Sequence, residues 1–349
     1  MESNSPIRAF AFALSSRSRE RFQMFETKTG LRSIATLITI AAITFASSIT
    51  PAAAEVQHAS TVRFIASKFV NKQYVEGFTA GKPDFGFTIE ALLQLRAAGQ
   101  TAKSFKPAVD FNLRSAANAG TSTKVGLLYV DKKFQTGRGG MFLVASKAFA
   151  LPKSTLSNSV LNSVKASVNK TGEIADANGN TFIYGWTVLG LKASGETKLA
   201  NLVATKLATL ARPDGGFGTD LTGDTMTSGS DATGMALMAF ASVAKSATAA
   251  QEKVKSTAST KAVTWLTKTA LVTDHFEAWG EVDVNGTAYA AMGLSAAGQK
   301  NAAVQKWLVT RIAPTGGLVS AYSSGAADIF ASAQGYIALL GSSYVSLIK

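Results

Sequence analysis

A nearly uncharged segment of small and apolar residues recurs six times along this chain. The copies span residues 88–99, 140–149, 184–195, 231–242, 287–298 and 332–341. Their ends are roughly 43 to 55 residues apart, and a regular period of this length is the signature of a repeat architecture. Four copies end in glycine, which supplies the left-handed cap of a helix at little steric cost. Each copy is therefore predicted to be one helix of a repeating unit.

Amphipathic segments with an ordinary polar face lie between these copies. They span residues 60–70, 107–118, 155–168, 199–211, 261–269 and 302–311. In the last of them Val304, Trp307 and Leu308 recur at helical spacing, while Lys306 and Arg311 can face water. Since the six copies carry few charges, we expect them to be the buried partners of these outer helices. The alternation predicts an all-α fold, an (α/α)6 toroid in which an inner barrel of helices lies inside an outer barrel.

The toroid is expected to form one domain over residues 55–349. No segment resembles a strand long enough to build a sheet. Residues 246–261, which are rich in lysine, serine and threonine, are predicted to form a loop between two repeats.

The first 54 residues have the pattern of a secretory signal peptide. Five basic residues between Arg17 and Arg32 precede an uncharged apolar stretch at 34–49, and a run of three alanines follows and ends at Ala54. A basic region, an apolar core and a small-residue cleavage site define such a signal. The apolar stretch is also shorter than the roughly 20 residues that cross a bilayer. We expect cleavage after Ala54, with an uncleaved anchor as the alternative and Met24 as an alternative start.

Composition narrows the chemistry and the partners. The chain has no cysteine, which excludes disulfides, thiol nucleophiles and thiolate metal sites. A formal charge of +13 suits anionic surfaces such as cell-envelope polymers or lipid head groups. Because the lysines are scattered and no basic run is interleaved with aromatics, nucleic acid is not an expected partner. We expect a secreted or envelope-associated monomer without a cofactor and without a membrane span after cleavage.

The most specific local motif precedes the fourth inner helix, at 231–242. It reads Asp214-Gly-Gly-Phe-Gly218 after an amphipathic helix, and Ser230-Asp-Ala-Thr-Gly234 follows it. An outer helix, this turn and a helix opened by a small polar residue resemble the repeat of the prenyltransferase and squalene-cyclase superfamily. Diluted versions lie at 84–88 and 315–318, and the resemblance covers residues 59–349. It implies the same (α/α)6 toroid and is greatest for the secreted bacterial members.

The catalytic signatures of that superfamily are not found in this sequence. Squalene-cyclase-like enzymes use an Asp-x-Asp-Asp acid, and no such tetrapeptide occurs here. Protein prenyltransferases hold zinc through Asp, Cys and His, and this chain has no cysteine. The sequence therefore leans against an enzyme, and we assign no catalytic residue.

Residues at the starts of the inner helices are the candidate ligand site, because these helices all begin at the same end of a toroid. Asp84, Asp231, Asp283 and Asp328 lie there, although helix N-capping also favours aspartate at these positions. Aromatic residues gather at the same level and would give a cavity apolar walls. Packing between inner helices is the alternative role of the aromatic rings. The predicted ligand-binding residues at this mouth are Phe85, Phe87, Tyr184, Trp186, Phe217, Asp231, Tyr289, Asp328 and Tyr336.

A histidine flanked by carboxylates is the remaining chemical candidate. His275 stands beside Asp274 and close to Glu277, but a metal would need a second imidazole or a third carboxylate in reach. We expect a solvated loop there and no metal site.

Three functions are open at this point. The first is a secreted, non-catalytic protein that binds an apolar small molecule or a cell-envelope glycan at the barrel mouth. The second is a glycan-cleaving or isoprenoid-converting enzyme that uses mouth carboxylates such as Asp231 and Asp328. The third is an adhesion or scaffold surface whose barrel is plugged by side chains.

Overall fold

The computed structural model describes residues 51–117, 126–219, 228–243, 248–278 and 280–349, with side chains from His58 onward. The predicted signal peptide therefore lies outside the described residues, apart from 51–54, which begin the first helix. The six inner helices are α3 (Phe85–Ala97), α5 (Thr136–Ala148), α7 (Thr181–Ala193), α9 (Ser230–Ser242), α11 (Val284–Ala296) and α13 (Ile329–Leu339). The six outer helices are α2 (Pro51–Ser67), α4 (Lys106–Ala117), α6 (Thr155–Ala166), α8 (Thr197–Ala208), α10 (Ala249–Thr264) and α12 (Ala302–Thr310).

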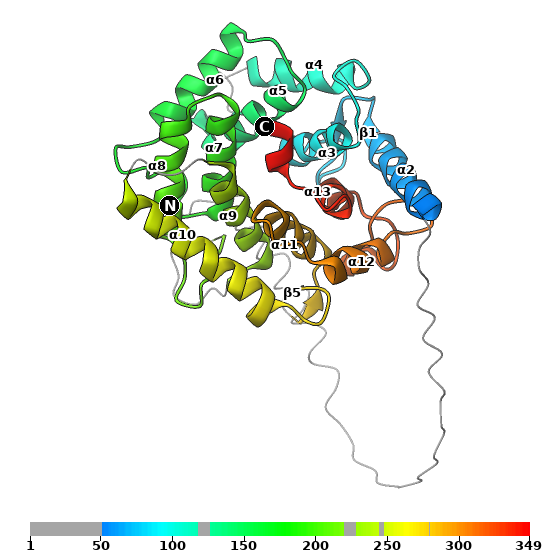
Figure 1. Cartoon of the computed structure of the whole chain (residues 1–349). Helices are drawn as coiled ribbons and strands as arrows, with labels where there is room; N and C mark the ends of the chain where they lie inside the picture. The colour runs from blue at the N-terminus through cyan, green and yellow to red at the C-terminus, as the bar shows by residue number, and fades with distance from the viewer. Residues whose placement is uncertain (1–50, 118–125, 220–227, 244–247, 279) are drawn as a thin grey trace, which may run out of the picture. The chain divides into compact units, whose positions relative to one another are not determined.

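The inner helices form a closed ring. Each contacts the next along the chain, and α13 contacts α3, which closes the circle (Figure 1). Outer helices cover the joints of this ring: α6 packs on α5 and α7, α8 on α7 and α9, and α12 on α11 and α13. The predicted (α/α)6 toroid is confirmed.

The strands within the described residues are each only two residues long. Three antiparallel hairpins of two-residue strands connect an outer helix to the next inner one. They pair β1 (Phe69–Val70) with β2 (Tyr74–Val75), β3 (Tyr129–Val130) with β4 (Lys133–Phe134), and β5 (Glu277–Ala278) with β6 (Glu281–Val282). The structure thus agrees with the expectation that no strand is long enough to build a sheet.

The predicted loop at 246–261 is wrong over its described part, because α10 begins at Ala249. Thr248 caps this helix by accepting a hydrogen bond from the backbone amide of Gln251. Ala258 and Ala262 are buried against the neighbouring elements. The helix continues as a π-helical turn, η2 (Trp265–Ala270), which buries Trp265. The buried face of α10 consists of alanines and the aliphatic part of the Lys255 side chain, which are only weakly apolar. An amphipathic pattern is therefore recognisable in the sequence only from residue 261 onward.

A buried hydroxyl clamps the start of four inner helices. The hydroxyl of Thr287 donates to the backbone carbonyl of Asp283 (2.6 Å) and accepts the amide of Phe276 from the preceding turn (3.0 Å). Thr88, Thr233 and Ser332 make the same pair of bonds at the starts of α3, α9 and α13. Each clamp joins an inner helix to the segment before it.

Glycines allow neighbouring inner helices to approach closely. A Cβ atom on Gly140 of α5 would lie 2.3 Å from the carbonyl oxygen of Trp186 on α7, and one on Gly234 of α9 would lie 2.2 Å from that of Tyr289 on α11. No side chain fits at such separations. The small residues of the repeats are therefore needed where backbone meets backbone.

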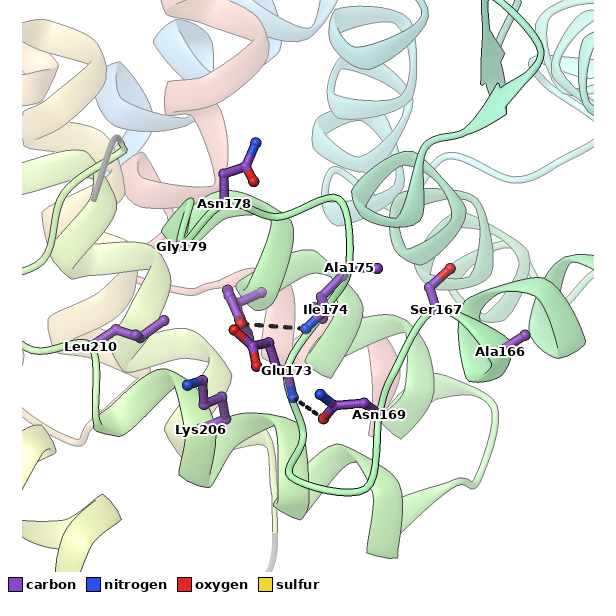
Figure 2. A pocket seen from close by; sticks show the side chains of 11 residues that line it. Ala166, Ser167, Asn169, Glu173, Ile174, Ala175, Asn178, Gly179, Lys206 and Leu210 are labelled. Carbon is purple, nitrogen blue, oxygen red and sulfur yellow. Dashed lines mark hydrogen bonds between the residues drawn. The ribbon is translucent and has the colours of Figure 1, made fainter. Parts of the chain in front are cut away.

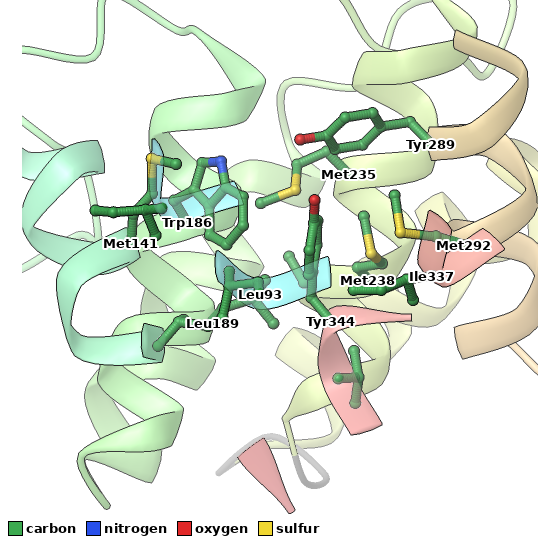
Figure 3. Packing of buried hydrophobic residues seen from close by; sticks show 14 of the residues in the cluster. Leu93, Met141, Trp186, Leu189, Met235, Met238, Tyr289, Met292, Ile337 and Tyr344 are labelled. Atoms are coloured by element: carbon green, nitrogen blue, oxygen red, sulfur yellow. The ribbon is translucent and has the colours of Figure 1, made fainter. Parts of the chain in front are cut away.

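The centre of the barrel is filled with side chains from all six inner helices. Figure 3 shows Leu93, Met141, Trp186, Leu189, Met235, Met238, Tyr289, Met292 and Ile337 around Tyr344. Tyr344 belongs to η4 (Tyr344–Ile348), a 3-10 helix that contacts α3, α5, α7 and α9 and lies in red among them in Figure 1. The third reading of the sequence, a barrel plugged by side chains, matches this arrangement of the core. Among the described residues, none of the helices is long and apolar enough to cross a membrane.

Candidate functional site

We call the first turns of the six inner helices the mouth of the barrel. Neighbouring inner helices run in the same direction, since Gly137 of α5 faces Ile183 of α7 and Gly140 faces Trp186 one turn later. The aspartates at the mouth act as caps. Asp84, Asp283 and Asp328 accept the backbone amides of residues 87, 286 and 330 at 2.8 to 2.9 Å. N-capping is therefore confirmed for these three carboxylates.

Asp231 differs from the other mouth aspartates. Gly229 occupies the N-cap position of α9, so Asp231 lies inside the first turn, where its carboxylate accepts the amide of Ala232 (2.6 Å). Burial, and next the charge of Asp283 on α11, raise the pKa of Asp231 to about 6. Burial also raises the pKa of Asp283. The mouth thus holds two neighbouring carboxyl groups that are harder to ionise than in water.

Three aromatic rings at the mouth contact one another. Phe330, in the first turn of α13, lies 4.4 Å from Phe87 of α3 and 4.7 Å from Phe78, between ring centroids. Phe78 precedes α3 and is 70% exposed. Tyr322 is 65% exposed, and partial burial, followed by the charges of Asp283 and Glu281, raises the pKa of its hydroxyl. The mouth therefore presents accessible aromatic surface beside carboxylates.

A polar network crosses the barrel directly below the mouth. Glu90 of α3 is buried; it accepts hydrogen bonds from the Tyr289 hydroxyl of α11 and from Nε2 of Gln334 on α13 (2.8 Å). Oε1 of Gln334 in turn accepts from Nδ2 of Asn285 (2.6 Å). Burial raises the pKa of Glu90 to about 7, although the bonds from Tyr289 and Gln334 work against the shift. A carboxyl group that exchanges its proton near neutral pH therefore lies in the barrel.

The nine predicted site residues separate into several groups. Phe87, Asp231 and Asp328 lie at the mouth, and Trp186 and Tyr289 pack deeper, against Tyr344. The side chains of the other four pack against neighbouring elements or line a side pocket.

Three predicted aromatic residues are buried in packing contacts, although Phe85 belongs to the first turn of α3. Phe85 stacks with Phe111 of the outer helix α4, and Tyr336 lies edge-on to His58 of the outer helix α2. Phe217 packs against Phe240 of α9. All three rings have packing roles, but Phe85 and Tyr336 contact outer helices, whereas the alternative expected packing between inner helices.

Tyr184 lines a side pocket of about 520 Å³ (Figure 2). The loop between α6 and α7 and the end of α8 form its walls, and Glu173 and Lys206 border it. The Tyr184 hydroxyl accepts the amide of Ile174 at 3.4 Å, and Asn169 Oδ1 accepts the amide of Glu173 (3.0 Å). The pocket therefore offers charged and hydroxyl groups, but it lies between an inner helix and its outer neighbours.

Two motifs singled out in the sequence have structural roles. Asp214, in the Asp-Gly-Gly-Phe-Gly turn, accepts the amide of Gly216 (2.9 Å) and the hydroxyl of Ser228 (2.8 Å). His275 pairs with Asp274 (2.9 Å) and stacks on Trp307 of α12 at 4.9 Å between centroids. Within the described part of the chain, no three histidine, aspartate or glutamate side chains form a group that could hold a metal ion.

Sequence reasoning missed Glu90, Gln334 and Tyr344. A signal existed for Glu90, which is the only acidic residue of helix α3 and lies among apolar residues. Tyr344 carried no such signal, because it lies in a short tail outside the repeats.

These features define the chain as an all-α protein of the (α/α)6 toroid fold with a mouth of aromatic and acidic residues. No protein-family model and no curated protein matches it. Among solved structures it is similar to a variant of the type II terpene cyclase MstE from Scytonema with bound geranylgeranyl dihydroxybenzoate. The TM-score is 0.60 at 13% identity, over 84% of this chain and 98% of that one. It is also similar to unsaturated glucuronyl hydrolase from Bacillus sp. GL1, with a TM-score of 0.52 at 12% identity, over 82% and 95%. At this identity the likeness shows the fold alone.

Proposed function

We propose that this chain is a secreted or envelope-associated binding protein that takes a cell-envelope glycan at the barrel mouth. The observation that carries the proposal is the filled barrel beneath an aromatic and acidic mouth. Of the two ligand classes that the sequence left open, an apolar molecule would need a deep cavity, and the barrel centre is occupied by side chains. A sugar can instead lie on exposed rings and bond to carboxylates.

The aromatic group of Phe78, Phe87 and Phe330 supports a surface site of this kind, because Phe78 is exposed and the other two rings are only half-buried. Exposed apolar patches rimmed by polar residues mark interaction sites on otherwise soluble proteins. Asp328 and Asp231 add acceptors for sugar hydroxyls at the same end of the barrel. The signal peptide proposed for residues 1–54 would bring the protein to such a glycan.

Co-sedimentation with insoluble envelope glycan tests the proposal. The double variant Phe87→Ala/Phe330→Ala should lose at least about tenfold in affinity, which corresponds to about 1.4 kcal/mol. Leu340→Ala is the matched control, because Leu340 is an exposed apolar side chain at the opposite end of α13. Binding should persist in 0.5 M salt, which screens attraction due to the +13 charge alone. Unchanged binding by a folded double variant would rule out the mouth.

A glycan-cleaving enzyme is the second candidate, and the pKa of Asp231 favours it. A carboxyl group with a raised pKa beside a second carboxyl group can serve as a general acid on a glycosidic bond. The glucuronyl hydrolase with the same fold is described as responsible for the degradation of glycosaminoglycan. The filled barrel makes the isoprenoid-converting version less suitable, since a long apolar substrate has no free space there. Asp231→Asn should abolish release of sugar from the envelope glycan and retain binding if this candidate is correct.

A further inference from the structure

The chain's own C-terminal segment occupies the centre of the barrel. It enters from the end at which the inner helices finish, and the helix η4 contacts four of them. Tyr344 is completely buried, and Val345 and Ile348 are nearly so. A terminal segment therefore contributes side chains to the middle of the core.

The attachment of this segment changes at Gly341. Up to that point the backbone is anchored: Ser295 donates its hydroxyl to the carbonyl of Gly341 (2.7 Å), and Gln305 donates to that of Leu339 (2.9 Å). Gly341 has a φ of 60°, in the left-handed region that favours glycine. The amide of Ser342 still bonds to the carbonyl of Ile337 in α13 (3.2 Å), whereas the amide of Ser346 bonds to the carbonyl of Ser343 within the segment itself (3.0 Å). From Ser343 onward the segment is therefore held mainly through its side chains.

The side chains around Tyr344 contact both the ring and the hydroxyl of its phenol group. Gln94 of α3 donates from Nε2 to the Tyr344 hydroxyl (2.9 Å). The ring lies 4.9 Å from that of Trp186 and 6.2 Å from that of Tyr289, between centroids. Methionines, whose side chains adapt to ligands of different shape, complete the walls (Figure 3). The surroundings combine aromatic contact with a positioned donor.

We propose that the C-terminal segment is a displaceable plug, and that the place of Tyr344 is a binding site for a small aromatic alcohol. A free aromatic alcohol competes with the Tyr344 side chain, which is tethered to the site. The effective concentration of such a tethered group is in the millimolar range or above. Displacement frees the segment beyond Ser342 and leaves the inner helices in place. The proposal concerns the barrel centre in an open state, whereas glycan binding is proposed for the mouth in the closed state that the structure describes, so neither proposal depends on the other.

Single cysteines report on plug opening, because the chain has no cysteine of its own. Val345→Cys places a thiol in the plug, and Val109→Cys places one of matched exposure on the outer helix α4 (8% and 7% exposed). Under native conditions the Val345→Cys thiol should react with a disulfide reagent at least tenfold faster. Its rate should depend little on low urea concentrations, since local opening exposes little surface. Equal rates that both follow global unfolding would overturn the proposal.

The chemical class of the ligand is tested with p-cresol, which has the side-chain structure of tyrosine. In the full-length Tyr344→Ala variant, p-cresol should raise Tm in a concentration-dependent way, and toluene should raise it less, because it cannot accept from Gln94. The control variant is Leu308→Ala, which creates a cavity at a buried position of the outer helix α12. Equal responses of the two variants to p-cresol would contradict the ligand class.

If Tyr344→Ala does not fold, the Val345→Cys variant tests the chemical class of the ligand instead. There p-cresol should accelerate labelling severalfold by holding the plug out, whereas no acceleration counts against the site. Neither measurement involves glycan, so their failure is separate from failure of the mouth proposal.

Discussion

The hydroxyl of Tyr289 on α11 donates a hydrogen bond to the carboxyl of Glu90 on α3, across the inner barrel. The two residues come from helices on either side of α13, which contributes Gln334 to the same carboxyl. Buried carboxyl groups are costly to ionise unless hydrogen-bond donors satisfy them. Here burial dominates and brings the pKa of Glu90 to about 7.

The raised pKa of Glu90 makes stability depend on pH. The folded state holds this proton up to about pH 7, whereas the unfolded chain releases it near 4.5. Its contribution is therefore fully present below pH 4.5 and is lost as the pH rises through 7. The size is about 3 kcal/mol for a shift of this order. Urea unfolding should show Glu90→Gln with a flatter decline in free energy of unfolding between pH 5 and 8 than wild type.

The exposed Glu173→Gln variant is the control and should keep the wild-type slope. Asp231, with its own raised pKa, should leave a residual decline of the same sign at lower pH in Glu90→Gln. An unchanged slope in Glu90→Gln would mean that the carboxyl is ionised in the folded protein at pH 5.

The two hydrogen bonds of the Thr287 hydroxyl should contribute more to the free energy of unfolding than the single hydrogen bond of a threonine within a helix. Thr287→Val keeps the shape but leaves the buried amide of Phe276 without an acceptor. We expect a loss of about 1–3 kcal/mol in free energy of unfolding. Thr267→Val is the matched control: Thr267 only donates to the carbonyl of Val263 in its own helical segment, and its loss should cost less than about 0.5 kcal/mol. Equal losses in urea unfolding would show that the clamp has no special role.

Close packing of the inner helices should make Gly234→Ala severely destabilising. The added Cβ would meet the carbonyl of Tyr289 at 2.2 Å, so α9 and α11 must separate. We expect a loss of about 3 kcal/mol or more, seen as a large drop in Tm. Gly86→Ala, where the nearest atom lies at 3.4 Å, should be neutral or gain about 0.5–1 kcal/mol by helix propensity. Similar Tm values for the two variants would contradict this packing argument.

Processing of the N-terminus remains a prediction from sequence. The mass of the protein exported by its host should correspond to a chain that begins at Glu55. Cleavage there would remove the first four residues of α2, a change that the remaining turns of this helix should tolerate. An exported chain that still contains residues before 34 would contradict cleavage and favour the anchor.

The order of helices could be predicted from sequence because the signals are local and repeated. Small apolar segments alternate with amphipathic ones, and glycines such as Gly298, with a φ of 76°, end the buried helices. The aspartate caps at the mouth could be anticipated in the same way, since capping depends on the next three residues only. Residues 249–260 of α10 were predicted as a loop because the buried face around Ala258 is too weakly apolar to show a period.

The sequence by itself determined the toroid and the aspartate caps at its mouth, since repeat length, caps and small-residue patterns act over a few neighbouring positions. Only the tertiary structure decided what fills the barrel. Glu90 meets Tyr289 and Gln94 meets Tyr344 across separations of 199 and 250 residues. Such contacts arise when the ring closes and brings side chains of all six inner helices to one axis. No local pattern encodes them, because burial and pairing there depend on every helix at once.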